Sequence, residues 1–169
     1  MKQIILLATF IVFLVSCNSS ADKTKAANLE IAKKYMQAVE SNDVAAMSDL
    51  LADNYKGYGP NDGDSTNKEE AIKNWKYNAE NLYESIKYSR HFNIAANVKE
   101  GEDAVPGDWV SNWAYLTIKY KDGRGPVHVY VNAIYKIENG KIALSRTFYN
   151  EADVLRQLGY TMDPPHVAE

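Results

Sequence analysis

The chain has 169 residues, of which 46% are hydrophobic and 24% are charged, with nine Gly and five Pro. This composition excludes collagen, a coiled coil and a largely disordered chain, and the length predicts one domain. Nineteen Lys and Arg residues oppose twenty-two Asp and Glu residues, so the net charge is −3. Because binding to a phosphate backbone requires a basic surface, we expect no nucleic-acid partner.

The first segment has the pattern of an export signal. Lys2 is the single charge ahead of an apolar run from Ile4 to Val15. A charged start and an apolar run of this length are typical of a signal peptide, whereas a membrane-spanning helix needs roughly 20 apolar residues. Leu14-Val15-Ser16-Cys17 resembles the bacterial lipobox, in which a signal peptidase cuts before a cysteine that then receives lipid.

We therefore expect residues 1–16 to be a lipoprotein signal peptide and Cys17 to be the lipidation site. The protein would be lipid-anchored to a membrane of the bacterial cell envelope, with its domain outside the cytoplasm. The alternative is an ordinary signal peptide followed by an incidental cysteine. Cys17 is the only cysteine, so the domain has no disulfide and no thiol nucleophile.

The polar residues that follow divide the chain further. Residues 17–26 are rich in Ser, Asn, Asp and Lys without apolar periodicity, which predicts a flexible lipidated tether. We expect the folded domain to span residues 27–160. Residues 161–169 contain Asp163-Pro164-Pro165 and are expected to form a loose tail.

Three helices are predicted in the first half of the domain. Apolar residues recur at helical spacing from residue 27 to Glu40, and Asp43 is placed to cap a second helix that reaches Leu51. Thr66-Asn67-Lys68-Glu69 has the spacing of a capping box and should open a third helix, which reaches Leu82.

The apolar period then changes from helical to two. Alternation predicts strands over residues 86–98, 108–121, 126–138 and 141–149, with Asp122-Gly123 and Asn139-Gly140 as hairpin turns. Asn150 should cap a short C-terminal helix. This order predicts an α+β fold in which three N-terminal helices pack on a curved antiparallel sheet of four to five strands.

Two stretches of the domain resemble the nuclear transport factor 2-like superfamily, in its SnoaL-like and ketosteroid-isomerase-like branches. They are Tyr35-Met36-Gln37-Ala38-Val39-Glu40-Ser41-Asn42-Asp43 and Glu138-Asn139-Gly140-Lys141-Ile142, the latter followed by Asp153-Val154-Leu155-Arg156-Gln157-Leu158-Gly159. The resemblance implies a cone-shaped fold with a pocket between sheet and helices. It covers nearly the whole domain but is poorly specific for function, because this fold carries many activities.

The ketosteroid isomerases allow a comparison by residue. Aligned without gaps from the first helix, their oxyanion-hole tyrosine falls on Tyr35 and their proton-transfer aspartate on Gly59. Counted back from the Asn139-Gly140 turn, their oxyanion aspartate falls on Asn132. The base is therefore missing, and Asp62 and Asp64 in the following loop are weak substitutes. The acidic residue of SnoaL-like cyclases falls close to Asn150, so an amide replaces an acid there too.

The same alignment predicts which strand faces line the pocket. The inward residues would be Trp113, Tyr115, Thr117, His128, Tyr130, Asn132, Ile134, Ser145, Thr147 and Tyr149. The opposite face of strand 126–138 carries Val127, Val129, Val131, Ala133, Tyr135 and Ile137. A large apolar face seldom stays exposed, so we expect a homodimer to cover it.

Three functions remain open from the sequence. The first is binding of a small apolar or aromatic ligand, with Trp113, Tyr115, Tyr130, Tyr149, Ser145, Thr147 and Asn150 as contacts. The second is a cyclase-, isomerase- or hydratase-like enzyme in which His128 is the general base and Tyr35 and Asn132 are oxyanion donors. The third is a non-catalytic dimerisation or interaction module. We expect neither metal nor cofactor, because the three His are scattered and no nucleotide or zinc motif occurs.

Overall fold

The computed structural model describes residues 2–101 and 105–161, with side chains from residue 20 onward. Along the chain lie α1 (Lys2–Glu40), α2 (Val44–Leu50), β1 (Leu51–Tyr58), β2 (Ser65–Asn67), α3 (Lys68–Tyr77), a π-helical turn (Asn78–Leu82), β3 (Tyr83–Val98), β4 (Gly107–Tyr120), β5 (Val127–Glu138), β6 (Lys141–Tyr149) and α4 (Glu151–Gln157). The Cys17 side chain and residues 162–169 of the expected tail lie outside the described residues.

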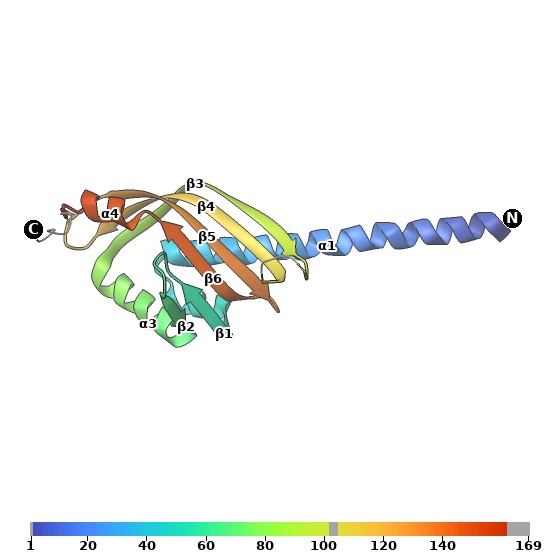
Figure 1. Ribbon diagram of the computed structural model, residues 1–169, viewed down its shortest axis with the longest axis horizontal. Helices are drawn as coiled ribbons and strands as arrows, with labels where there is room; N and C mark the ends of the chain where they lie inside the picture. The colour runs from blue at the N-terminus through green and yellow to red at the C-terminus, as the bar shows by residue number, and fades with distance from the viewer. Residues whose placement is uncertain (1, 102–104, 162–169) are drawn as a thin grey trace, which may run out of the picture.

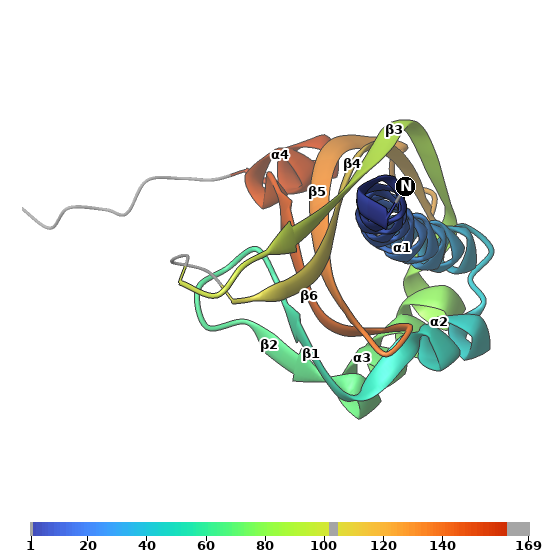
Figure 2. The same ribbon diagram turned by 90° about the vertical axis from the view of Figure 1, so that its right-hand side faces the viewer.

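The strands form one curved sheet in the order β2-β1-β6-β5-β4-β3. Every neighbouring pair is antiparallel except β1 and β6, which are parallel. The sheet bends around the C-terminal part of α1, and α2 and α3 lie at the side that the sheet leaves open (Figure 2). The predicted α+β cone is therefore confirmed, with six strands instead of four to five, because β1 and β2 add to the predicted antiparallel set.

Local signals set several of these boundaries. The Asp43 carboxylate accepts a hydrogen bond from the Ala46 amide at 2.9 Å, as the predicted cap requires. The capping box of α3 is shifted by one residue from the prediction, since it joins Asn67 and Glu70. Asn139 and Gly140 both have positive φ, which the tight β5–β6 turn requires.

Helix α1 is longer than the sequence predicts. It begins at Lys2, so residues 17–26, expected as a flexible tether, are helical. Half of this segment is Asn, Ser, Asp and Thr, which favour helix weakly, so its helical form continues the turns of the packed part rather than following from its composition. Packing against the domain begins at Asn28, which is 7% exposed, and the earlier part of α1 projects away from the sheet (Figure 1). Within the described residues, none of the helices combines the length and apolar character needed to cross a membrane.

The core lies between α1, α2 and the concave face of the sheet. Its most buried side chains include Met47, Leu51, Val110, Val127 and Ile142. The apolar face of β5 belongs to this core, because Val129, Ala133, Tyr135 and Ile137 are buried within a single chain. The prediction that this face needs a second copy to cover it was therefore wrong.

Candidate functional site

A cavity of about 480 Å³ opens between the concave face of the sheet and helices α1 and α3. Its wall combines aromatic side chains, among them Trp75, with aliphatic ones such as Val39, Ile86, Leu116 and Val129. Eight of the twelve tyrosines of the chain line it, namely Tyr35, Tyr55, Tyr58, Tyr83, Tyr88, Tyr120, Tyr135 and Tyr149. The helices and the sheet thus hold an aromatic chamber that the side chains leave unfilled.

The deep tyrosines are neutral phenols. Burial raises the pKa of Tyr35 and of Tyr135 far above the ordinary value of 10.0, and it raises the pKa of Tyr83 to about 12. The pKa of Tyr88 is raised as well, by burial and then by the nearby Glu40 carboxylate. Tyr35 packs edge-on against Tyr135 with ring centroids 5.8 Å apart. At neutral pH these side chains therefore offer hydroxyl donors and electron-rich ring faces.

One wall of the cavity depends on a glycine. The Tyr55 hydroxyl and the Ser145 hydroxyl lie 2.6 Å apart, joining β1 to β6. A Cβ atom on Gly57 would lie only 2.5 Å from the Tyr55 hydroxyl and 2.8 Å from the Thr66 hydroxyl. Because Gly57 has no Cβ atom, the hydroxyls of Tyr55 and Thr66 can both lie close to the backbone of β1.

Asp64 is the only charged residue among those that line the cavity. It is exposed, and its carboxylate lies against Gly59, where an added Cβ would be 2.7 Å from Oδ2. No hydrogen bond or ion pair reaches this carboxylate from the rest of the described chain. Asp64 therefore places an unpartnered carboxylate directly beside the backbone of Gly59.

Comparison with solved structures identifies this architecture. A putative polyketide cyclase from Xanthomonas campestris has a TM-score of 0.65 and 15% identity, covering 79% of this chain and 98% of its own. A Catenulispora acidiphila protein with a ketosteroid isomerase-like fold, in complex with trimethylamine, has a TM-score of 0.60 and 16% identity, covering 80% and 98%. An NTF2-like protein of unknown function from Burkholderia pseudomallei has a TM-score of 0.60 and 12% identity, covering 79% and 98%.

The chain has the nuclear transport factor 2-like fold. The resemblance seen in the sequence is thereby confirmed at the level of the fold. No protein-family model matches the chain, and no curated protein matches it either.

The residues that the sequence predicted as ligand contacts lie on two different surfaces, the cavity wall and the outer face of the sheet. Tyr35 on α1 and Ser145, Thr147 and Tyr149 on β6 line the cavity. On β4 and β5 the opposite faces turn inward, so that Asn112, Leu116, Val129, Ala133 and Tyr135 line it instead. Trp113 and Tyr130 are 49% and 66% exposed on the outer face. There they surround a shallow depression with Val131, Asn132, Phe148, Tyr149 and Asn150. The inward orientation predicted for β4 and β5 was therefore wrong.

His128 also lies on the outer face and is exposed. Its Nδ1 atom is 3.2 Å from the Thr117 hydroxyl, and its ring stacks on that of Tyr115 at 5.8 Å between centroids. The Asn132 amide donates to the Ser111 hydroxyl at 3.0 Å and to the Asn112 carbonyl at 2.9 Å. Tyr35 is across the sheet from both, so the expected constellation of His128, Tyr35 and Asn132 does not form.

The physical reason is the apolar pattern of β5. A strand face that is apolar at every second position is buried most simply against the helices of its own chain. The sequence carried this signal, but the ungapped alignment assigned the polar face to the pocket. Six lining tyrosines were missed as cavity residues because tyrosine at an apolar position is also typical of a core: Tyr55, Tyr58, Tyr83, Tyr88, Tyr120 and Tyr135.

Asn112 is a polar residue that the sequence did not single out. It is 1% exposed, and its amide donates to the Asn93 side-chain oxygen at 2.9 Å. It therefore supplies one fixed amide in a largely apolar wall. Across the described residues, no group of three or more His, Cys, Asp or Glu is arranged to hold a metal ion.

Proposed function

We propose that this protein binds a small, largely apolar or aromatic molecule in the tyrosine-lined cavity. The observation that carries the proposal is an open cavity of about 480 Å³ whose wall is mostly aromatic and aliphatic, with placed hydroxyl and amide groups. That size and composition are typical of small-molecule sites. The trimethylamine complex of the Catenulispora protein supports the view that a domain of this fold can take up a small organic molecule.

Native mass spectrometry of the purified protein, followed by thermal shift against a compound panel, tests this proposal. A ligand at 100 times its Kd should add about 2.7 kcal/mol of stability. Ala133→Leu would narrow the cavity, whereas Ile134→Leu alters the opposite face of the same strand and serves as the matched control. Loss of binding in both variants, or no co-purified mass and no stabilising compound, would contradict the proposal.

A second candidate is an isomerase- or lyase-like enzyme, favoured by the position of Asp64. Its carboxylate lies beside Gly59, the position on which the isomerase base falls, at a cavity lined by neutral tyrosine hydroxyls. A carboxylate of this kind can take a proton while a phenol stabilises the resulting oxyanion. Incubating a bound ligand in D₂O tests this: deuterium should enter the ligand with the native protein and fail to enter with Asp64→Asn.

We also propose that Cys17 is lipidated and holds the domain at a membrane of the cell envelope. The supporting observations are the sequence Leu14-Val15-Ser16-Cys17 and the projection of α1 ahead of Asn28 away from the domain, of which residues 17–27 would remain after cleavage (Figure 1). Such an arm would leave the cavity clear of the anchor. Labelling of cells with a palmitate analogue should mark the native protein, and Cys17→Ser should abolish both the label and membrane fractionation.

For the expected homodimer we propose the outer face of the sheet as the interface. This face carries exposed Trp113, Tyr130 and Phe148 around the shallow depression on β4–β6. Exposed aromatic side chains grouped in this way are typical of interaction surfaces. Light scattering after size exclusion should give a dimer mass that Trp113→Ser reduces to a monomer mass. A monomer of the native protein would favour a different protein as the partner of this face.

A further inference from the structure

We infer that the ligand of the cavity carries a positively charged ammonium group. This inference deepens the proposed binding function and depends on it. It rests on the charges that line the cavity, on the nature of its aromatic wall and on the position of Asp64.

The single charged residue of the cavity wall is negative. Among the residues that line the cavity, Asp64 is charged negatively and none is Lys, Arg or His. Arg124 lies over the ring of the lining residue Tyr120 at 5.9 Å, but its guanidinium is already paired with Asp122 at 2.7 Å. Arg146 lies over Tyr58, but it is not a lining residue, because its neighbours Ser145 and Thr147 on β6 are the ones that face the cavity. An anionic ligand would therefore find no cation among the described residues of the cavity wall itself, and burying an unpaired charge there is costly.

The aromatic wall favours a cation. Tyrosine rings carry negative electrostatic potential on their faces, and cations bind over them within about 6 Å. Phenols have an ordinary pKa of 10.0, which burial raises further for Tyr35, Tyr83 and Tyr88, so none of them supplies a negative charge near pH 7. Several neutral tyrosines around one cavity resemble the aromatic cages that hold alkylated ammonium groups.

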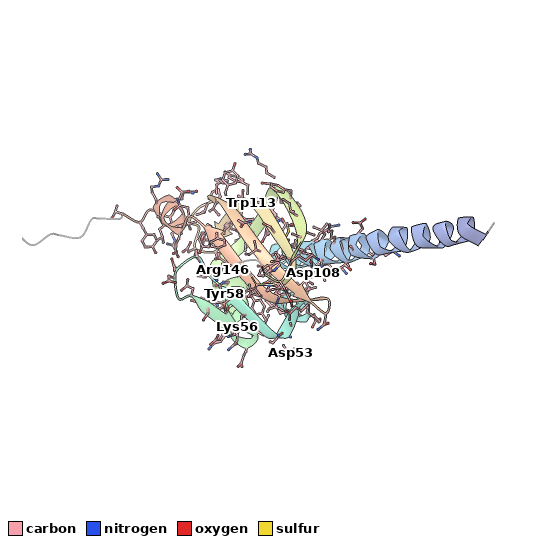
Figure 3. The ribbon with its side chains drawn as sticks, turned by 45° about the vertical axis from the view of Figure 1, so that its right-hand side comes forward. Asp53, Lys56, Tyr58, Asp108, Trp113 and Arg146 are labelled. Atoms are coloured by element: carbon pink, nitrogen blue, oxygen red, sulfur yellow. The ribbon has the colours of Figure 1, made fainter. Side chains whose placement is uncertain are left out.

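The chain itself uses one of these tyrosines to bind a cation. The Arg146 guanidinium carbon lies 4.9 Å from the ring centroid of Tyr58. Tyr58 and Arg146 are paired in register on β1 and β6, and their side chains lie next to each other in Figure 3. Arg146 does not line the cavity, so this contact shows that one ring face of Tyr58 holds a cation outside it.

Asp64 supplies the countercharge. Its carboxylate lies at Gly59 on the cavity wall, and neither a hydrogen bond nor an ion pair from the described residues satisfies it. The pKa of Tyr149 is raised mainly by burial, then by Glu151 and Tyr120, and last by Asp64. Tyr149 is thus close enough to sense this charge. An ammonium group between Asp64 and the tyrosine rings would satisfy the carboxylate and the ring faces together.

Calorimetric titration of the purified full chain with three probes of one shape tests this inference: benzylammonium, benzyl alcohol and benzoate. We expect benzylammonium to bind about tenfold more tightly than benzyl alcohol, and benzoate to bind most weakly. Asp64→Asn should remove most of the preference for the cation. Asp62→Asn, which changes an equally exposed carboxylate of the same loop outside the cavity wall, should leave it intact.

Each outcome separates the inference from the proposal on which it rests. Benzyl alcohol or benzoate binding as tightly as benzylammonium would overturn the charge preference while leaving a working cavity. An equal preference in native protein and Asp64→Asn would overturn the role of Asp64. Binding of none of the three probes, together with no stabilising compound in the wider panel, would overturn the binding function itself.

Discussion

The side-chain amide of Gln157 pairs with the backbone of His128 in both directions. The His128 amide donates to Gln157 Oε1 at 2.8 Å, and Gln157 Nε2 donates to the His128 carbonyl at 2.8 Å. The β5–β6 ladder ends at Val131 and Tyr149, so His128 lies beyond it on β5. Gln157 thus makes the two hydrogen bonds that β6 would make with His128 if it extended that far, and it fixes α4 to the sheet.

Gln157→Ala should therefore loosen α4 and expose the His128 amide. Each hydrogen bond contributes about 0.5–1.5 kcal/mol, so we expect a loss of about 1–2 kcal/mol in local stability. Hydrogen exchange should accelerate at the His128 amide and in α4. Arg156→Ala removes a surface ion pair with Asp153 on the same helix and should have little effect. Unchanged exchange at His128 in Gln157→Ala would contradict this account.

Gly57→Ala should distort the cavity wall. The new Cβ would overlap the Tyr55 hydroxyl at 2.5 Å, which must then leave Ser145. We expect destabilisation of about 1–3 kcal/mol in urea unfolding, typical of overpacking. The double variant Tyr55→Phe/Gly57→Ala removes the overlapping hydroxyl and should recover part of the loss. If the two substitutions are simply additive, the clash is not with this hydroxyl.

Asn67→Ala should weaken α3 by about 1 kcal/mol, because the Asn67 side chain accepts the Glu70 amide at 2.9 Å. Thr66→Ala changes the neighbouring residue, which lines the cavity but does not cap the helix. Equilibrium unfolding should show the larger loss for Asn67→Ala. A larger loss for Thr66→Ala would instead support the capping residue predicted from the sequence.

The buried tyrosines should make the fold sensitive to alkali. Burial raises the folded-state pKa of Tyr83 to about 12 from an ordinary value of 10.0, and the pKa values of Tyr35 and Tyr135 are raised as well. Because the unfolded chain releases these protons first, their contribution to stability is complete below about pH 10. The contribution of Tyr83 is lost as the pH rises through about 12, and those of Tyr35 and Tyr135 are lost at still higher pH.

A rapid jump to pH 12 should therefore give two phases of tyrosinate absorbance. The slow phase should coincide with the loss of the circular dichroism signal, because the deep phenols ionise only when the domain opens. Tyr135→Phe should reduce the amplitude of the slow phase, whereas Tyr77→Phe, which removes an exposed phenol, should not. Complete ionisation before any loss of secondary structure would contradict the burial of these groups.

Much of the fold was readable from the sequence. The Asp43 and Asn150 caps and the Asn139-Gly140 turn depend on neighbouring residues alone, and all three form as predicted. Alternation located β3 to β6 because apolar period and strand pleat are local properties. The short strand β2 was missed because its pairing with β1 is a tertiary event.

The site was harder to predict. Alternation gave two possible faces for β5, and the choice between them depended on what the helices cover. The polar face with His128 and Asn132 looked like a pocket lining, yet α1 and α3 pack over the apolar face with Tyr135. Tyr35 and Ser145 are in the cavity because their elements meet there, which no local pattern encodes.

The sequence by itself determined the order of elements, the caps and turns, and the nuclear transport factor 2-like fold that their order builds. These follow from interactions between residues close along the chain. Only the tertiary structure decided which strand faces enclose the cavity, and it brought the Asp64 carboxylate against Gly59. The choice of strand faces depends on how the sheet curves around α1, and curvature arises from contacts between residues far apart in sequence. The approach of Asp64 to Gly59 depends on the path of the loop between them, which the side-chain pattern does not encode.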